Sequence, residues 1–378
     1  MAIITEDVVA RLDRIGQGPV GFAPVRNERR RLGAWLAHYR AIGVERFVVV
    51  DNGSTDGGQE FLEAQPDVVA LRSDGSFAAA NCGIEWLTDL HRLVRPGTWI
   101  LFADADELLV YRGWPARPLR SLLADAEAED ATAALAFMLD MYPDGPLESA
   151  PAGADLMAAA PCFDGEYVFR RPPTRPWQPP APGIEVLGGP RLRLLSSLDR
   201  ERRSGWLAYL LRGQFDRVLP FTPDALLPLL VALMPRQMPN LSKVPLVRAG
   251  SGALYANVHT AIGARPFHEN AVLLHYKFLA DFAAKVAVEC GRHEHYRRGS
   301  EYLMYAKLLK THGALDLRHA GTRRFAGAEQ LVQLGLIRDL SPLLAPHASR
   351  GQPQGTREAD PCRSSDGPEP SPRPPLAA

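Results

Sequence analysis

The chain has few of the features that mark a disulfide scaffold or a nucleic-acid-binding protein. Its four cysteines show neither paired nor metal-finger spacing, so we expect reduced thiols. Lysine plus arginine and aspartate plus glutamate both total 43, which leaves no excess charge to attract nucleic acid or an anionic membrane. Arginines cluster locally at residues 29–31, where we expect a solvated face. We therefore predict no nucleic-acid partner.

Long hydrophobic runs are also missing. The first residues lack the basic and then apolar segments of a secretory leader. The most apolar later stretch, residues 226–234, contains Pro228 and is too short to cross a bilayer. These absences predict a cytoplasmic protein without a membrane span, and they leave peripheral membrane association open.

The first part of the sequence alternates strand-like and helix-like segments. Apolar, β-branched runs predict strands, and the amphipathic or cap-rich stretches between them predict helices. The expected strands are residues 20–25, 47–50, 68–71, 99–103 and 133–141, and the expected helices are residues 29–42, 59–65 and 78–93. This alternation predicts an α/β, Rossmann-like fold with a mixed, mostly parallel sheet covered by helices.

The rest of the chain is less regular. Residues 171–183 are rich in proline and predict an extended loop, whereas residues 278–309 again predict helix. The tail combines proline, glycine, serine and charge with almost no apolar residue, so we expect disorder there. The expected divisions are a lead segment (1–19), a first half (20–145), a less regular second half of the same domain (146–342) and the tail (343–378).

The most informative motif is Asp104-Ala105-Asp106-Glu107, directly after the apolar residues 99–103. Residues two apart on an extended chain point to the same side, so Asp104 and Asp106 can face one site together. Carboxylates this close repel each other, and a divalent cation is the usual way to hold them. The motif predicts Asp104 and Asp106 as ligands of Mn²⁺ or Mg²⁺, and a solvated acidic loop is the simpler alternative.

Two more polar clusters follow the first two expected strands. Ligands of parallel sheets sit beyond the carboxyl ends of the strands, so these clusters are expected to face the same site. Helix-start chemistry explains Asn27 and Glu28 about as well, and Ser54 or Thr55 could simply cap the next helix. The predicted substrate-binding residues in these clusters are Arg26, Asn27, Glu28, Asp51 and Asn52.

Later residues offer further candidates. His275 could be another metal ligand and Lys277 a phosphate contact, although a core histidine satisfied by its neighbours is an equal alternative. Lys243 could bind a diphosphate or merely cap the surface. A general base must be a carboxylate beyond the metal ligands, and Asp140 and Asp144 follow the next expected strand. Asp144, within Pro-Asp-Gly, is also a typical turn residue.

Together these motifs resemble the family-2 glycosyltransferases, and more closely the branch related to family 92. The resemblance implies a GT-A fold, a nucleotide-sugar donor (a UDP-sugar by preference), a divalent cation and inversion at the anomeric carbon. It implies that Asp51 contacts the base, that Asp104 lies near the ribose or the metal, which it would help to bind, and that Asp106 binds the metal. The segments that carry it are residues 25–28, 35–44, 51–56, 99–108, 242–246 and 275–278.

The sequence departs from this family in two places. Asp51-Asn52 stands where many members have two adjacent aspartates, and the Gln-x-x-Arg-Trp motif of processive members is absent. The second departure favours transfer of a single sugar to a glycan or another hydroxyl-bearing acceptor. In the implied mechanism the acceptor hydroxyl, deprotonated by Asp140 or a neighbour, attacks the anomeric carbon while the metal on Asp106 stabilises the leaving diphosphate.

Two alternatives remain open. A nucleotidyltransferase also combines an α/β sheet with acidic metal ligands, but it usually carries a glycine-rich, basic phosphate loop where Arg26-Asn27-Glu28 stands here. A catalytically silent protein that binds sugar nucleotides could keep the acidic cluster and lack the base.

Overall fold

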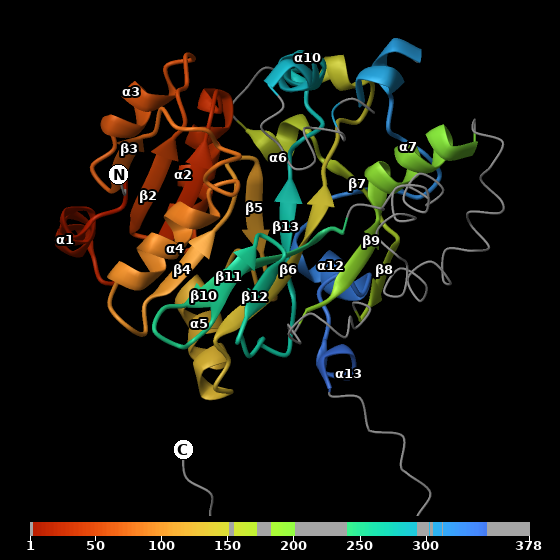
Figure 1. Ribbon diagram of the computed structural model, residues 1–378. Helices are drawn as coiled ribbons and strands as arrows, with labels where there is room; N and C mark the ends of the chain where they lie inside the picture. Colours follow the sequence, from red (N-terminus) through yellow and green to blue (C-terminus); the bar gives the residue numbers. More distant parts are fainter. Residues whose placement is uncertain are drawn as a thin grey trace, which may run out of the picture. The chain divides into compact units, whose positions relative to one another are not determined.

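An eight-stranded mixed sheet forms the centre of the computed structural model, which describes residues 3–150, 155–171, 183–200, 240–292, 302, 305–311 and 313–345. The strand order is β3-β2-β1-β4-β10-β6-β13-β5, and helices flank the sheet (Figure 1). The strands are β1 (Val20–Val25), β2 (Arg46–Asp51), β3 (Val68–Arg72), β4 (Trp99–Phe102), β5 (Glu107–Val110), β6 (Ala133–Asp140), β10 (Ser242–Arg248) and β13 (Ala271–His275).

Helices and short strand pairs surround this sheet. The described helices are α1 (Glu6–Ile15), α2 (Arg29–Ala41), α3 (Gly58–Glu63), α4 (Ile84–Leu93), α5 (Leu119–Ala128), η1 (Leu147–Ser149), α6 (Leu156–Ala159), α7 (Gly189–Arg200), α10 (Phe282–Arg292), α12 (Ala328–Gln333) and α13 (Ser341–Leu344). The paired short strands are β11 (Leu254–Asn257) with β12 (Thr260–Ile262), β7 (Cys162–Asp164) with β14 (Thr322–Arg324), and β8 (Tyr167–Arg170) with β9 (Glu185–Gly188). None of the helices in this described part is long and apolar enough to cross a membrane.

Six strands of the large sheet run in one direction, and β10 and β5 run in the other. β1 is parallel to β2 and β4, β2 to β3, and β13 to β6, whereas β10 is antiparallel to both β4 and β6. β5 forms the antiparallel edge beside β13. The carboxyl ends of the six strands therefore meet the amino ends of β10 and β5 at one edge of the sheet. In Figure 1 the arrowheads of β2, β6 and β13 point toward this edge, where α10 lies.

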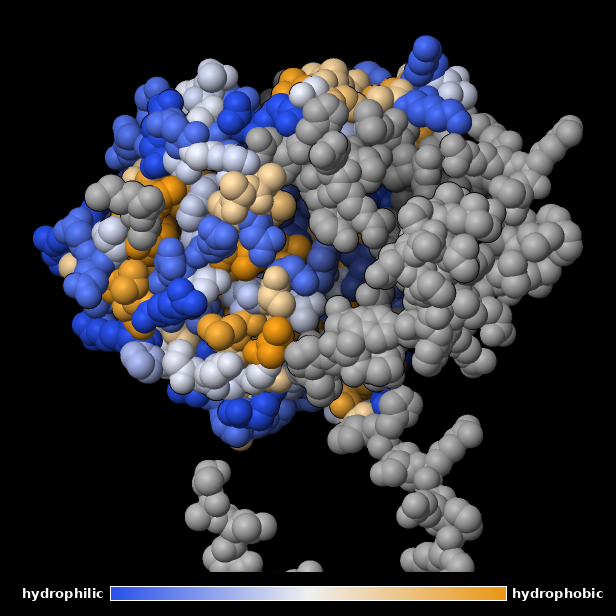
Figure 2. Space-filling model, in the orientation of Figure 1, coloured by the Kyte–Doolittle hydropathy of each residue, from blue (hydrophilic) through white to orange (hydrophobic). Residues whose placement is uncertain are grey.

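The core lies on both faces of the central strands. Every residue of β1, β2, β4 and β6 is buried, which is why these strands are continuous apolar runs and show no alternating pattern. The outer surface is different: Figure 2 shows mostly hydrophilic side chains with scattered apolar patches on the visible face. Exposed apolar residues include Leu254 and Ile262, which are cross-strand partners in the β11–β12 pair.

The predicted α/β fold with a mostly parallel, helix-covered sheet is confirmed. The strands expected in the first part of the chain correspond to β1, β2, β3, β4 and β6, with ends that differ by no more than about one residue. The sheet also takes β10 and β13 from the less regular second half. The division of the chain at residue 145 stays a prediction.

One helix was predicted wrongly at its start. The expected helix over residues 78–93 begins only at Ile84. Asn81, Cys82 and Gly83 have φ values of 49°, 56° and 84°, and three successive left-handed residues cannot belong to a right-handed helix. Of the other predicted segments, most of the loop over 171–183, part of the helix over 278–309, and residues 346–378 of the tail lie outside the described residues.

Close packing between β1 and β2 depends on a glycine. Gly21 is paired with Phe47, and a Cβ atom at Gly21 would lie only 2.5 Å from a ring carbon of Phe47. That ring is fully buried and packs against Trp35, with ring centroids 5.4 Å apart. The Phe47 side chain therefore has little room to move away.

We expect Gly21→Ala to lower the free energy of unfolding by about 1–3 kcal/mol, because the added methyl group overpacks the core. Gly33→Ala is the control: nothing lies within 4 Å of its Cβ position in α2, so alanine should stabilise the protein by about 0.5–1 kcal/mol. Denaturant unfolding of both variants checks this. A Gly21→Ala protein as stable as the unaltered chain would contradict the packing described here.

Candidate functional site

Ionisable side chains, most of them with little solvent exposure, converge where β4, β6 and β13 end and β5 and β10 begin. The strand directions bring them together, because the reversed strands present their first residues at the edge where the parallel strands present their last. His275 is aligned with Glu107 on one neighbouring strand and with Asp140 on the other. The residues that meet here are Asp104, Asp106, Glu107, Asp140, Lys243 and His275.

Lys243 balances two of these carboxylates. Its Nζ atom lies 2.6 Å from Oδ2 of Asp104 and 2.6 Å from Oε1 of Glu107. Burial works against a charged lysine, but the carboxylates of Asp104 and Glu107 hold the pKa of Lys243 well above its usual value. Lys243 is only 3% exposed, so the alternative that it caps the surface is wrong.

His275 is held from one side by Asp140. Its Nδ1 atom lies 2.6 Å from Oδ1 of Asp140, and Arg191 of α7 donates to both oxygens of the same carboxylate at 2.7 and 2.9 Å. Burial would raise the pKa of Asp140, but Arg191 and His275 hold it below its usual value. The ionised carboxylate can only accept, so it places a proton on Nδ1 of His275.

Asp106 faces the other side of the same ring. Its Oδ2 atom lies 3.6 Å from Nε2 of His275, and its side chain is 18% exposed. In the described ranges no lysine or arginine lies within 4 Å of this carboxylate. Burial would raise the pKa of Asp106, but the neighbouring His275 and the cations Lys285 and Arg31 hold it well below its usual value. Asp106 is therefore an ionised carboxylate without a close basic partner other than His275.

The gap between Asp106 and His275 fits a metal ion. In the neutral ring, which carries its single proton on Nδ1, the lone pair of Nε2 faces a carboxylate oxygen 3.6 Å away, a distance too long for a hydrogen bond. Two ligand atoms that share a cation at roughly 2.0–2.2 Å lie about 3–4 Å apart. Ligand atoms of Asp106, Glu107 and His275 all lie within 4.8 Å of one another. The predicted ligands Asp106 and His275 thus come together with Glu107, which, like Asp104, is also paired with Lys243.

A second network ties α2 to α10 beside this cluster. Arg31 donates to both oxygens of Asp281 at 2.8 and 2.9 Å and lies 3.2 Å from Glu28, which also pairs with Lys285 at 2.5 Å. Arg31 is fully buried, so the expectation of a solvated face is wrong for this residue. Its position among buried apolar residues of α2 was the signal available in the sequence. Glu28 contacts two cations within the protein, and its role in substrate binding stays a prediction.

At the ends of β1 and β2, the predicted substrate-binding residues Arg26, Asn27 and Asn52 form hydrogen bonds with backbone groups of the protein itself. Arg26 donates to the carbonyl of Asn52 at 2.7 Å, and the side chain of Asn52 donates to the carbonyls of Ser73 and Gly75. Asn27 has a φ of 53° and accepts from the backbone N–H of residue 55.

Asp51 differs from these neighbours. One of its carboxylate oxygens accepts from the backbone N–H of Ser54 at 2.7 Å, and the other is buried without a hydrogen-bond partner among the described residues. This oxygen is available to accept from a ligand.

The two predicted general bases have other partners. Asp140 is fully buried and accepts from Arg191 and His275, so its geometry does not favour proton transfer from an acceptor hydroxyl. Asp144 is 55% exposed and lies near Arg318 and Arg324. Lys277 lies 5.0 Å from the ring centroid of Tyr302. The structure therefore does not bring Asp144 or Lys277 into the carboxylate cluster.

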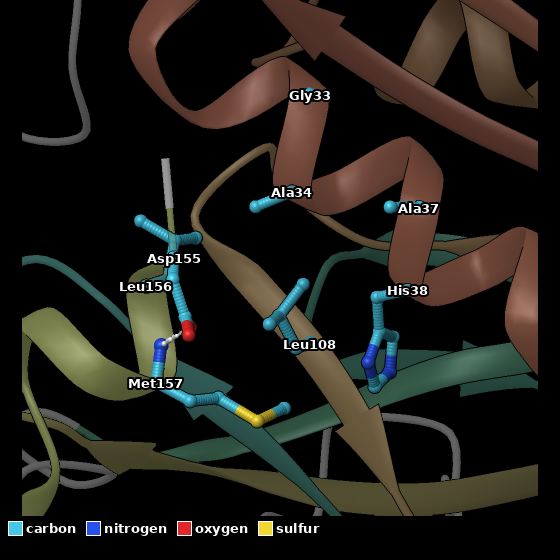
Figure 3. Close-up of a pocket in the computed structure, with 8 residues that line it drawn as sticks. All are labelled: Gly33, Ala34, Ala37, His38, Leu108, Asp155, Leu156 and Met157. Carbon is cyan, nitrogen blue, oxygen red and sulfur yellow. Dashed lines mark hydrogen bonds between the residues drawn. The ribbon is translucent and has the colours of Figure 1, made fainter. Parts of the chain in front are cut away.

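A separate cavity of about 420 Å³ lies between α2 and α6. In Figure 3 the carboxylate of Asp155 points to the backbone N–H of Met157 and accepts a hydrogen bond from it at 3.0 Å. The ring of His38 donates to the carbonyl of Leu109, and burial lowers the pKa of His38 to about 4. None of the predicted site residues lines this apolar cavity, whose lining is Gly33, Ala34, Ala37, His38, Leu108, Asp155, Leu156 and Met157.

Comparisons with known proteins add little. No protein-family model matches the sequence, and no curated protein matches it. Among solved structures, the chain is similar to a nucleotidyl transferase from Methanothermobacter thermautotroptrophicus, with 19% identity over 38% of this chain and 74% of that chain. The TM-score is 0.19, and a similarity this slight carries no inference about fold or activity.

We expect Lys243→Met to lower the free energy of unfolding by up to about 3–5 kcal/mol, because Glu107, whose pKa burial already raises to about 7, would lose its counter-charge and would have to take up a proton to stay buried. Adding Glu107→Gln to this variant should restore much of the loss, since the uncompensated charge is then removed. Denaturant unfolding measures both. Lys285→Met is the control. The Lys285 side chain is 27% exposed, and Glu28 would still be paired with Arg31, so we expect the free energy of unfolding to fall by only about 1 kcal/mol. Equal losses in both single variants would contradict this account of Lys243.

Proposed function

We propose that the chain is a GT-A glycosyltransferase that moves a single sugar from a nucleotide-sugar, a UDP-sugar by preference, to an acceptor hydroxyl with inversion. The observation that carries the proposal is the opposition of Asp106 and His275 Nε2, beside Glu107, at the carboxyl edge of the sheet. The resemblance to family-2 glycosyltransferases supplies the class of donor. The acceptor is a glycan or another hydroxyl-bearing molecule.

The order of the strands supports a nucleotide that lies along this edge. Ligands of open α/β sheets bind beyond the carboxyl ends of the strands, and β2, β1 and β4 are consecutive neighbours there. At the end of β2, the unpartnered oxygen of Asp51 could accept from a base or ribose donor. At the end of β4, Asp104 and Asp106 would face the ribose and the diphosphate side. A nucleoside diphosphate has suitable polar partners at both ends of this path.

Asp106 and His275 would hold Mn²⁺ or Mg²⁺, with Glu107 as the third candidate ligand. The cation, when bound, would offset the negative charge that develops on the departing diphosphate. The chain itself prepares the surroundings: Lys243 neutralises Asp104 and Glu107, and Asp140 fixes the His275 ring. Arg31 and Lys285 add positive potential near Asp106.

Neither of the two predicted general bases fits this site. Asp140 is not proposed for this role, because Arg191 and His275 already occupy its oxygens. Asp144 lies in the segment after β6, paired with Arg318 and Arg324 outside the carboxylate cluster, so it is not placed to take a proton at this site either.

The test is a panel of donors followed by thermal unfolding. We expect a UDP-sugar with Mn²⁺ to raise the melting temperature, by an amount that corresponds to about 2.7 kcal/mol at 100 times its Kd, and GDP- and dTDP-sugars to have smaller effects. Asp106→Ala should abolish the Mn²⁺-dependent shift and the turnover of the donor while the protein remains folded. Asp125→Ala, an exposed aspartate on α5, should change neither.

Three outcomes would contradict the proposal. Full metal-dependent turnover in Asp106→Ala would exclude the assigned site. Release of diphosphate from a nucleoside triphosphate and a sugar phosphate would identify a nucleotidyltransferase instead. Donor binding without transfer or hydrolysis, across a panel of glycan acceptors, would identify a silent binding protein.

A further inference from the structure

We infer that Arg191 and Asp140 are positioning residues that fix the His275 ring with Nε2 toward Asp106 and so set the affinity of this site for its cation. The inference rests on the proposed function only for the presence of that cation. It assigns Asp140 a role other than general base, and it gives a role to Arg191, which no sequence pattern singled out.

The three residues form one buried hydrogen-bonded chain from three elements. Arg191 comes from α7, Asp140 ends β6 and His275 ends β13, and their side chains are 5%, 0% and 9% exposed. Asp140 and His275 are aligned partners on adjacent parallel strands, so the backbone places the carboxylate beside the ring. The N–H of Met141 also donates to the carbonyl of His275 at 2.9 Å, which fixes the backbone next to the ring.

This arrangement determines which nitrogen of the His275 ring can bind a cation. A neutral ring can carry its proton on either nitrogen, and only the nitrogen without the proton can bind a cation. Asp140 accepts from Nδ1 and thereby leaves the lone pair on Nε2, the atom that faces Asp106. Arg191 donates to both carboxylate oxygens, so Asp140 cannot rotate away from the ring. Outer partners of this kind are commonly worth 10–100-fold, roughly, in metal affinity.

The same helix contains a second arginine–aspartate pair without this connection, whose arginine side chain is more exposed (35% against 5%). Arg193 donates to both oxygens of Asp164 at 2.7 and 3.0 Å, nearly the geometry of Arg191 with Asp140. Asp164 accepts further from Tyr142 and His319, and it does not contact His275. A merely structural role for Arg191 would therefore predict similar effects when either arginine is replaced.

The experiment measures Mn²⁺ affinity of the purified full-length chain without donor, from the free Mn²⁺ signal in electron paramagnetic resonance. We expect Asp140→Asn to weaken binding by about 10–100-fold, because an amide can pair with either tautomer and no longer selects one. Arg191→Met should weaken binding in the same direction. Arg193→Met should leave the Kd within about twofold of the unaltered chain, because it has no connection to His275.

A double-mutant cycle separates positioning from general damage. If Asp140 acts through the ring, Asp140→Asn should cause no further loss in a His275→Ala background. Circular dichroism melts establish that each variant is folded. Should Asp140→Asn fail to fold, Arg191→Lys replaces it in the cycle, since lysine keeps the charge and loses the two-pronged contact.

Several results would overturn the inference. They are an unchanged Kd in folded Asp140→Asn, additive losses in the cycle, or an equal loss in Arg193→Met. Absence of Mn²⁺ binding by the unaltered chain would overturn the cation site and this inference together. Normal Mn²⁺ binding without sugar transfer would count against the proposed function alone and would leave the positioning roles intact.

Discussion

Repulsion among carboxylates at one edge of the sheet is the constraint on which the rest of this structure depends. Four of them meet there, and two, Glu107 and Asp140, are fully buried, so the cluster needs counter-charges close by. Lys243 forms ion pairs with Asp104 and Glu107, and Arg191 forms one with Asp140. Within the described residues, Asp106 alone has only an imidazole for a partner. Because Asp106 lacks a lysine or arginine partner among the described residues, its negative charge can attract a metal ion to the site.

The mixed topology is what makes the balance possible. In an all-parallel sheet, the first residues of every strand would lie at the edge opposite to the last ones. β10 and β5 are reversed, so Lys243 and Glu107 begin their strands at the edge where Asp104 follows β4. A cation from one strand thus reaches between carboxylates from two others. The same reversal places Glu107 beside His275.

Local patterns in the sequence predicted the local parts of this structure. The apolar runs of β1, β2, β4 and β6 were visible because burial on both faces leaves charged residues only at the ends of β2 and β6. The partnership of Lys243 with Asp104 was not visible, since it joins residues 139 positions apart and depends on how β10 enters the sheet. Arg191 had no signal at all, because its surroundings in the sequence show no regular period. Arg31 stands within a run of three arginines, and its position beside the buried apolar residues of α2 is what distinguishes it from the other two.

The separation between Lys243 and Asp104 has a consequence for the order of events during synthesis. Asp104 and Glu107 leave the ribosome 139 and 136 residues before the lysine that neutralises them, so the early sheet of β1 to β4 carries an unshielded acidic rim. β10, which lies between β4 and β6, supplies the lysine that neutralises these carboxylates. The same strand therefore completes the sheet and neutralises its edge, and a chain that ended before β10 would leave Asp104 and Glu107 with only counter-ions from the solvent.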